Sequence, residues 1–179
     1  SAIGDVCHAV SAVQAIQKAH PNAKITWVIG KVEAMLLANL PGVELVVFDK
    51  KQGRVALKNL KQTFKGQNFD VLLNMQVALR AGFVARCIPA KVKIGFDWAR
   101  SKELHSLFIN KRIAAQPHAH VLEGFKGFAK AIGVNDYQPS WEMPYTQQDQ
   151  NTADELLTAE YLSNKLFVIS PAASKAQRN

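Results

Sequence analysis

The chain begins with SAIGDVCHAV (residues 1–10), and this stretch decides how the rest is interpreted. Gly4 and Asp5 stand directly before an apolar stripe at helical spacing. The stripe consists of Val6, Ala9, Val10, Val13 and Ile16. A Gly-Asp pair in this place is typical of the turn between a first strand and a first helix of an α/β sheet. We therefore expect a strand ahead of Ser1 to feed this turn, so that the first strand is missing from the sequence.

Asp5 has two readings. Its carboxylate fits an N-cap or first-turn site, where it accepts hydrogen bonds from free backbone N–H groups at the positive end of the helix dipole. It also fits a chemical role, because open α/β sheets bind ligands at the edge where strands lead into helices. The residues alone leave both readings open.

Alternating apolar runs and amphipathic stretches follow. We predict strands over residues 24–30, 43–48, 69–74, 92–96 and 166–170. We predict helices over residues 32–40, 54–65, 77–87, 121–132 and 152–163. Most of the strands are short and apolar on both faces, which is typical of a parallel sheet covered by helices on both sides. The fold class is therefore α/β, with a parallel sheet.

Two segments depart from this alternation. Residues 97–112 mix aromatic and charged side chains and read as a loop with a short helix. Residues 135–148 are polar, contain Pro139 and Pro144, and read as a linker. We therefore divide the chain into an α/β domain over residues 1–148 and, over 149–179, a helix with the start of a second domain.

The net charge is +8 and the sequence pI is near 9.6, which indicates an anionic partner such as nucleic acid, acidic lipid headgroups or a phosphorylated substrate. One stretch concentrates this charge in Lys50, Lys51, Arg54, Lys58, Lys61 and Lys65. The last four are spaced for one helix face, which is either a solvated surface or a ligand site. Its loop end, at Lys50, Lys51 and Arg54, is best placed to touch a ligand.

Several kinds of functional feature find no support in the sequence. Cys7 and Cys87 make no disulfide framework and read as core thiols. His118 and His120 have no cysteine or carboxylate at metal-ligand spacing, so we expect no metal. No apolar run reaches the roughly 18 residues of a membrane span. There is no G-x-G-x-x-G run and no P-loop, so we expect no nucleotide cofactor.

The stretch of residues 1–30 resembles the amino-terminal part of the lipopolysaccharide heptosyltransferases of glycosyltransferase family 9, in particular members that add the first heptose to Kdo. The resemblance continues through FDVLLNMQVALRAGFVAR, KIGFDWAR, LFINKR, HVLEGF and SPAASKAQRN. It implies a GT-B enzyme with two Rossmann-like domains, of which this chain holds the acceptor-binding one. It further implies that ADP-heptose is the donor, that Kdo of lipid A is the acceptor, and that transfer inverts the anomeric carbon.

The resemblance assigns roles to residues. Asp5 becomes the general base that takes the proton of the acceptor hydroxyl. The implied acceptor-binding residues are Lys50, Lys51, Arg54, Gln76, Arg80, Asp97 and His120. The implied donor-binding residues are Gly4, Ser174, Lys175 and Arg178. A plain surface role for Arg80 and a helix-start role for His120 remain open.

Two alternatives also remain open. The chain fits another family 9 transferase with a different donor or acceptor, and its charge fits a non-catalytic basic module that binds nucleic acid. No aromatic residues are interleaved with the basic helix, so no base-stacking platform is evident and we expect no nucleic-acid partner. We expect a cytoplasmic protein that contacts the anionic inner face of the bacterial inner membrane peripherally.

Overall fold

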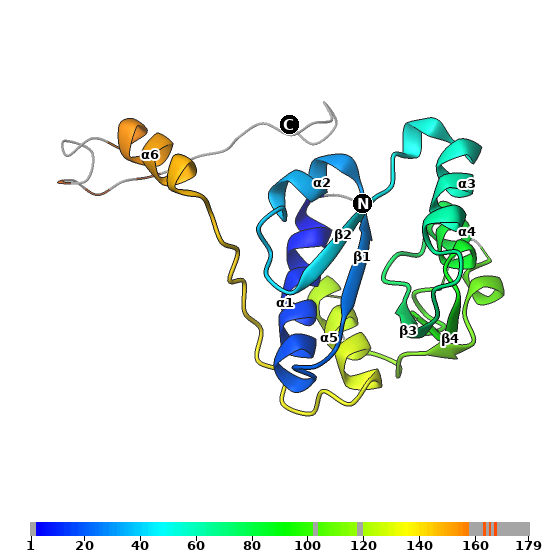
Figure 1. Ribbon diagram of the computed structural model, residues 1–179. Helices are drawn as coiled ribbons and strands as arrows, with labels where there is room; N and C mark the ends of the chain where they lie inside the picture. Colours follow the sequence, from blue (N-terminus) through cyan, green and yellow to red (C-terminus); the bar gives the residue numbers. More distant parts are fainter. Residues whose placement is uncertain are drawn as a thin grey trace. The chain divides into compact units, whose positions relative to one another are not determined.

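The computed structural model describes residues 3–101, 104–117 and 120–157, with residues 163, 165 and 167. The chain divides into two compact units, Ser1–Met143 and Pro144–Asn179 (Figure 1). The first unit contains α1 (Ile3–Ala19), β1 (Ile25–Ile29), α2 (Lys31–Leu36), β2 (Val43–Val47), η1 (Lys50–Gln52), α3 (Arg54–Thr63), β3 (Phe69–Leu73), α4 (Leu79–Cys87), β4 (Ala90–Gly95), η2 (His105–Phe108), β5 (Lys111–Arg112) and α5 (Val121–Ala131). The second unit contains α6 (Gln147–Leu156). The predicted boundary at residue 148 stays a prediction.

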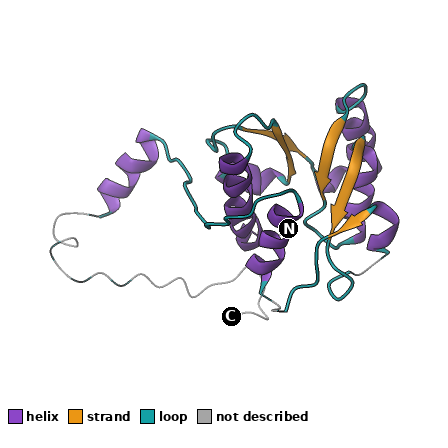
Figure 2. Ribbon diagram, turned by 90° about the horizontal axis from the view of Figure 1, so that it is seen from below, coloured by secondary structure: helices purple, strands orange, loops and turns teal. Residues whose placement is uncertain are grey.

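All strand pairs are parallel, as predicted, but they form two sheets and not one (Figure 2). β1 pairs with β2 from Ile25↔Val43 onward, and the second sheet has the order β3-β4-β5. A single sheet would require a strand between β1 and β3, and the described residues supply none. The strand β5, which pairs with the end of β4, was also not predicted, because two residues carry no periodicity.

Helices cover both faces of the strands. In β3, Leu73 packs on the side of α1 and α5, whereas its neighbour Leu72 packs on the side of α3. β1 divides in the same way, with Trp27 facing the first side and Val28 the second. This alternation follows from the two-residue period of a strand. Because each helical layer contacts both sheets, the predicted arrangement of helices on both faces is confirmed.

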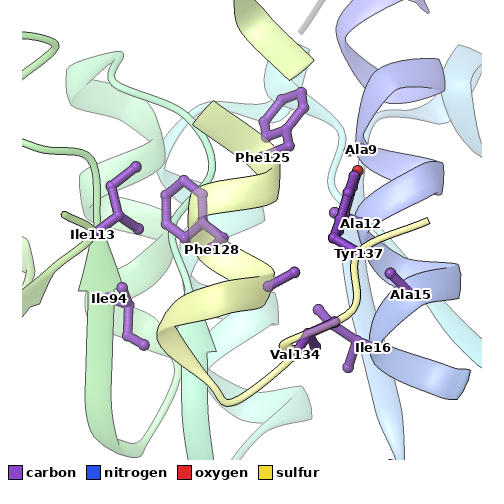
Figure 3. Packing of buried hydrophobic residues seen from close by; sticks show 11 residues of the cluster. Ala9, Ala12, Ala15, Ile16, Ile94, Ile113, Phe125, Phe128, Val134 and Tyr137 are labelled. Carbon is purple, nitrogen blue, oxygen red and sulfur yellow. The ribbon is translucent and has the colours of Figure 1, made fainter. Parts of the chain in front are cut away.

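The main core lies where α1 and α5 pack on β4 (Figure 3). Phe128 is fully buried there and meets Phe96 edge to face with ring centroids 4.9 Å apart. α1 supplies small residues to this contact, including Ala9 and Ala12. The hydroxyl of Ser11 hydrogen-bonds that of Tyr137 at 2.6 Å, which ties the loop after α5 to α1.

Two local predictions were wrong. Gly4 and Asp5 lie inside the described α1, which begins at Ile3, and not in a turn before it. The helix predicted from residue 152 begins at Gln147, because Thr146 and Asp149 form a capping box with reciprocal hydrogen bonds. The end of that predicted helix and the predicted strand 166–170 lie largely outside the described residues. In the part of the chain that the structure describes, no helix is both long and apolar enough to cross a bilayer.

Candidate active site

The amino-terminal turns of α1 lie at the carboxyl end of β1. Val6 and Val10 pack in one buried cluster with Ile29, the last residue of that strand. Asp5 sits in the first turn of α1 and is half-buried. The first-turn site predicted for Asp5 is therefore confirmed, and this turn lies near the strand end where ligands are expected.

His8 stands one turn after Asp5, on the same face of α1. Its ring meets that of His120 edge to face, with centroids 5.8 Å apart. His120 is the N-cap of α5, and its Nδ1 accepts a hydrogen bond from the backbone N–H of Leu122 at 3.2 Å. His120 therefore has the helix-start role that the sequence left open. Its contact with His8 could not be predicted from the local sequence.

The start of α5 in turn lies against the carboxyl end of β4. A Cβ added at Gly124 would stand 3.1 Å from the ring of Phe96 and 3.9 Å from Nε of Arg100. The first turns of α1 and α5 therefore border the same edge as the residues that follow β4. This edge brings together Asp5, His8, His120 and the loop beginning at Asp97.

The loop after β4 is held by an internal ion pair. Asp97 is 3% exposed, and its two oxygens accept hydrogen bonds from Arg100, one from the backbone N–H at 2.9 Å and one from Nη1 at 2.8 Å. Burial alone raises the pKa of the Asp97 carboxyl, but the hydrogen bonds and charge of Arg100 outweigh it and hold the pKa below its usual value. Asp97 therefore holds the turn after β4 through Arg100, and its predicted contact with the acceptor stays a prediction.

Arg112 fastens the far end of the same loop. Its guanidinium donates to the Phe96 carbonyl at 2.9 Å and to the hydroxyls of Ser101 and Ser106. It also lies 3.6 Å from the ring centroid of Trp98, which is 75% exposed. The result is a rim that carries an exposed indole.

His105 supports this rim from below. It is buried, and its Nε2 accepts the backbone N–H of Phe96 at 3.2 Å. Burial, aided by the charge of Arg112, lowers the pKa of this imidazole. The neutral ring fits Gly95 closely, because a Cβ at that glycine would collide with His105.

Basic residues follow β2 at its carboxyl end. Lys50 and Lys51 lie in η1, which Asp49 caps by accepting the N–H of Lys51 at 2.9 Å. Gly53, with φ of +54°, turns the chain into α3, which starts at Arg54. All three cations are exposed, and no carboxylate of the described residues forms an ion pair with them.

Two further predicted residues follow β3. Gln76 is half-buried, and its side-chain oxygen accepts the N–H of Val77 at 3.1 Å. Arg80 is exposed in the first turn of α4. The predicted acceptor residues thus lie after the carboxyl ends of β2, β3 and β4, while their binding role stays a prediction.

Sequence reasoning missed two buried polar residues in this region. Glu33 is buried in α2, just after β1, and Asn74 is buried just after β3. Nδ2 of Asn74 and Nδ1 of His8 are buried without a hydrogen-bond partner in the described structure. Such atoms are rare in folded proteins, and they mark positions where a ligand or water completes the bonding. The only signal for such residues in the sequence was a polar side chain at the end of an apolar strand, as at Asn74.

Of the predicted donor residues, Gly4 lies beside Asp5 in the first turn of α1, and the other three fall outside the described residues. Gly4 is exposed on α1, with no neighbouring atom within 4 Å of an added Cβ. Ser174, Lys175 and Arg178 lie outside the described residues. Within the ranges that the structure describes, no group of three His, Cys, Asp or Glu residues is placed to hold a metal ion.

Comparison with known proteins decides the family. The model of glycosyltransferase family 9 (heptosyltransferase) matches residues 57–179. This chain belongs to glycosyltransferase family 9. It is 44% identical, over all 179 residues, to the lipopolysaccharide core heptosyltransferase OpsX of Haemophilus influenzae, of which it covers 51%. Lipopolysaccharide heptosyltransferase 1 of Escherichia coli K12 is 28% identical in an alignment 171 residues long that covers 88% of this chain and 51% of that protein.

A solved structure of a family member has the same fold. The E. coli heptosyltransferase WaaC with ADP superposes with a TM-score of 0.67 at 28% identity, covering 80% of this chain and 48% of the other. The predicted Rossmann-like, GT-B-type fold class is therefore confirmed. This family 9 chain spans about half the length of these relatives.

Proposed function

We propose that this family 9 chain is the acceptor-binding half of an inverting heptosyltransferase that moves heptose from ADP-heptose to Kdo of lipid A. The observation that carries the proposal is the first-turn carboxylate of Asp5, at the strand edge shared with His8 and His120. Names of relatives support the general reaction, since they are heptosyltransferases of the lipopolysaccharide core and one structure holds ADP. The Kdo acceptor and the ADP-heptose donor are our finer assignment.

The proposed chemistry is a single displacement. Asp5 accepts the proton of the acceptor hydroxyl as that oxygen forms its bond to the anomeric carbon of heptose. The bond from that carbon to the ADP phosphate oxygen breaks on the opposite face, and ADP leaves with the electron pair. A negatively charged carboxylate also favours the positive charge that develops on the sugar.

The cations after β2 and β3 would hold the acceptor. Kdo carries carboxylates and lipid A carries phosphates, and both are anions that Arg54 and Arg80 can bind through paired hydrogen bonds. Neither side chain forms an ion pair with a carboxylate of the described residues, which leaves their donors available there. A lipid-linked acceptor would place the enzyme at the cytoplasmic face of the inner membrane, where a basic surface is attracted to anionic lipids.

The test is Asp5→Asn in the full-length enzyme, with ADP-heptose and Kdo-lipid A as substrates. We expect kcat to fall by roughly 10²–10⁴-fold, the usual contribution of a general base, with a smaller change in the acceptor KM. Asp136→Asn is the matched control, since Asp136 is an exposed aspartate of the same unit after the end of α5. Near-normal kcat in Asp5→Asn, with both proteins folded, would remove Asp5 as the base.

A further inference from the structure

A large cavity lies at the other end of the strands, away from the candidate active site. Its volume is about 840 Å³, within the range of small-molecule sites. Its walls include Gly66 and Asn68, just before β3, and Pro89 and Ala90, at the start of β4. The cavity therefore opens at the amino ends of β3 and β4, whereas Asp97 and Asn74 follow their carboxyl ends.

The cavity is lined by cations from three elements. They are Lys58, Lys61, Lys65, Arg86, Lys91 and Lys93. No carboxylate of the described residues lines it. The floor is apolar and includes the buried ring of Phe64. Basic walls above an apolar floor fit an anion that is joined to a less polar body.

The local charge balance favours an anion. The carboxyl ends of α3 and α4 point here, and each helix end carries the equivalent of about half a negative charge. One carboxylate nearby, Asp70, pairs with Lys91 at 3.5 Å, with both side chains largely exposed. Six positive charges exceed these opposing charges, so the wall keeps a net positive potential.

Lys93 is fixed in a way that leaves donors for a ligand. Its Nζ donates one hydrogen bond to the Ala85 carbonyl at 2.7 Å, and an ammonium group has three donors. Burial lowers the pKa of Lys93, although the nearby Cys87 opposes this shift. An anion beside it would offset the cost of burying that charge.

We propose that this cavity is a second anion site, which binds ligands carrying at least two phosphate groups. It is separate from the transferase edge and does not depend on the reaction proposed above. A single phosphate would contact only part of a wall that spans three elements. In this proposal, one phosphate is held by cations of α3 and the other by cations of the α4–β4 segment.

Cys87 provides a local measurement in the full-length protein, because it lines the cavity and is half-buried. Inorganic pyrophosphate should slow alkylation of Cys87 by iodoacetamide, as followed by peptide mass spectrometry. Cys7, on α1, is the internal reference and should react at an unchanged rate. Equal protection of both thiols, or none at Cys87, would overturn the proposal.

Charge variants test the cations themselves at constant ionic strength. In Lys61→Gln/Lys65→Gln/Arg86→Gln, the pyrophosphate concentration for half-protection should rise about tenfold or more, because charge-assisted contacts are lost. The control removes the same charge elsewhere on the unit, by Lys18→Gln/Lys24→Gln/Lys130→Gln, and should change it by less than about twofold. Equal weakening in both triple variants would mean diffuse attraction and no site.

A thermal shift provides a second readout that does not depend on the thiol. Pyrophosphate should raise Tm of the wild type and the control, and raise it less in the cavity variant, because a ligand that binds only the folded state stabilises it. An equal rise in all three proteins would place the anion elsewhere.

Vesicles then identify the source of the phosphate. If the cavity variant alone loses binding to an equal mixture of phosphatidylcholine and cardiolipin, whose headgroup carries two phosphates, the ligand is a lipid headgroup. If only pyrophosphate protection is lost, the ligand is soluble.

Discussion

The two ends of the parallel strands differ in how their charged side chains are paired. At the carboxyl end, buried or rim charges have fixed partners, as in the Asp97–Arg100 pair and the Arg112 guanidinium over Trp98. At the amino end, six cations surround an open cavity, and among the described residues only Lys91 has a carboxylate partner. The carboxyl end therefore combines a fixed rim after β4 with exposed cations after β2 and β3, whereas the amino end gathers its cations around one cavity.

The helix α3 connects these ends. Arg54 begins the helix beside the carboxyl end of β2, and Lys61 and Lys65 lie at or just beyond its other end. A helix rises about 1.5 Å per residue, so Arg54 and Lys65 stand roughly 16 Å apart along it. The sequence presented them as one basic face, but the fold divides that face between two places.

The largest expected effect that separates the two ends is on acceptor binding. Arg54→Ala and Arg80→Ala should each raise the acceptor KM by about 10–100-fold, because each removes charge-assisted hydrogen bonds to an anionic substrate. The Lys61→Gln/Lys65→Gln/Arg86→Gln variant should leave that KM within about twofold. Steady-state kinetics with the full-length enzyme measures all three. An unchanged KM in both arginine variants would refute the acceptor site, and a raised KM in the cavity variant would join the two ends into one site.

The next effect is on stability. Asp97→Asn should lower the free energy of unfolding by about 2 kcal/mol, because it leaves Arg100 without its buried partner. Asp70→Asn removes the exposed pair with Lys91, at the amino end, and should change stability little. Urea unfolding of both variants makes the comparison. Equal effects would mean that the Asp97 pair contributes no more than a surface contact.

Local pattern was enough to predict most of the fold. Runs such as KITWVIG and FDVLLN are apolar on both faces, and they form β1 and β3 within one or two residues of the predicted ends. Position after a strand also located Gln76 and Arg80 correctly at the carboxyl end. These features depend on neighbours in sequence, so periodicity and turn residues reveal them.

Features that depend on distant segments could not be predicted. The His8–His120 contact joins residues more than one hundred positions apart, and the basic cavity exists only because α3 and α4 end side by side. The single predicted sheet assumed a strand ahead of Ser1, whereas the described chain forms two sheets. The start of α6 was predicted too late, because the polar stretch with two prolines looked like a linker and hid the capping box at Thr146.

The smallest expected effect is a pH dependence that belongs to the carboxyl-end rim. Burial depresses the pKa of His105 in the folded state, so the unfolded chain binds more protons than the folded one near the usual histidine pKa of about 6.5. The stability that neutral His105 contributes is therefore fully present above that pH, and it is lost as pH falls through the lower, folded-state pKa. Protonation would also remove the acceptor that Nε2 offers to the Phe96 N–H.

Tm, measured by calorimetry between pH 7.5 and about 5, should fall more steeply in the wild type than in His105→Gln. His20→Gln, which changes a histidine on the loop after α1, should keep the wild-type slope. Parallel slopes for the wild type and His105→Gln would show that the rim does not titrate in this range and that the pH sensitivity lies elsewhere in the protein.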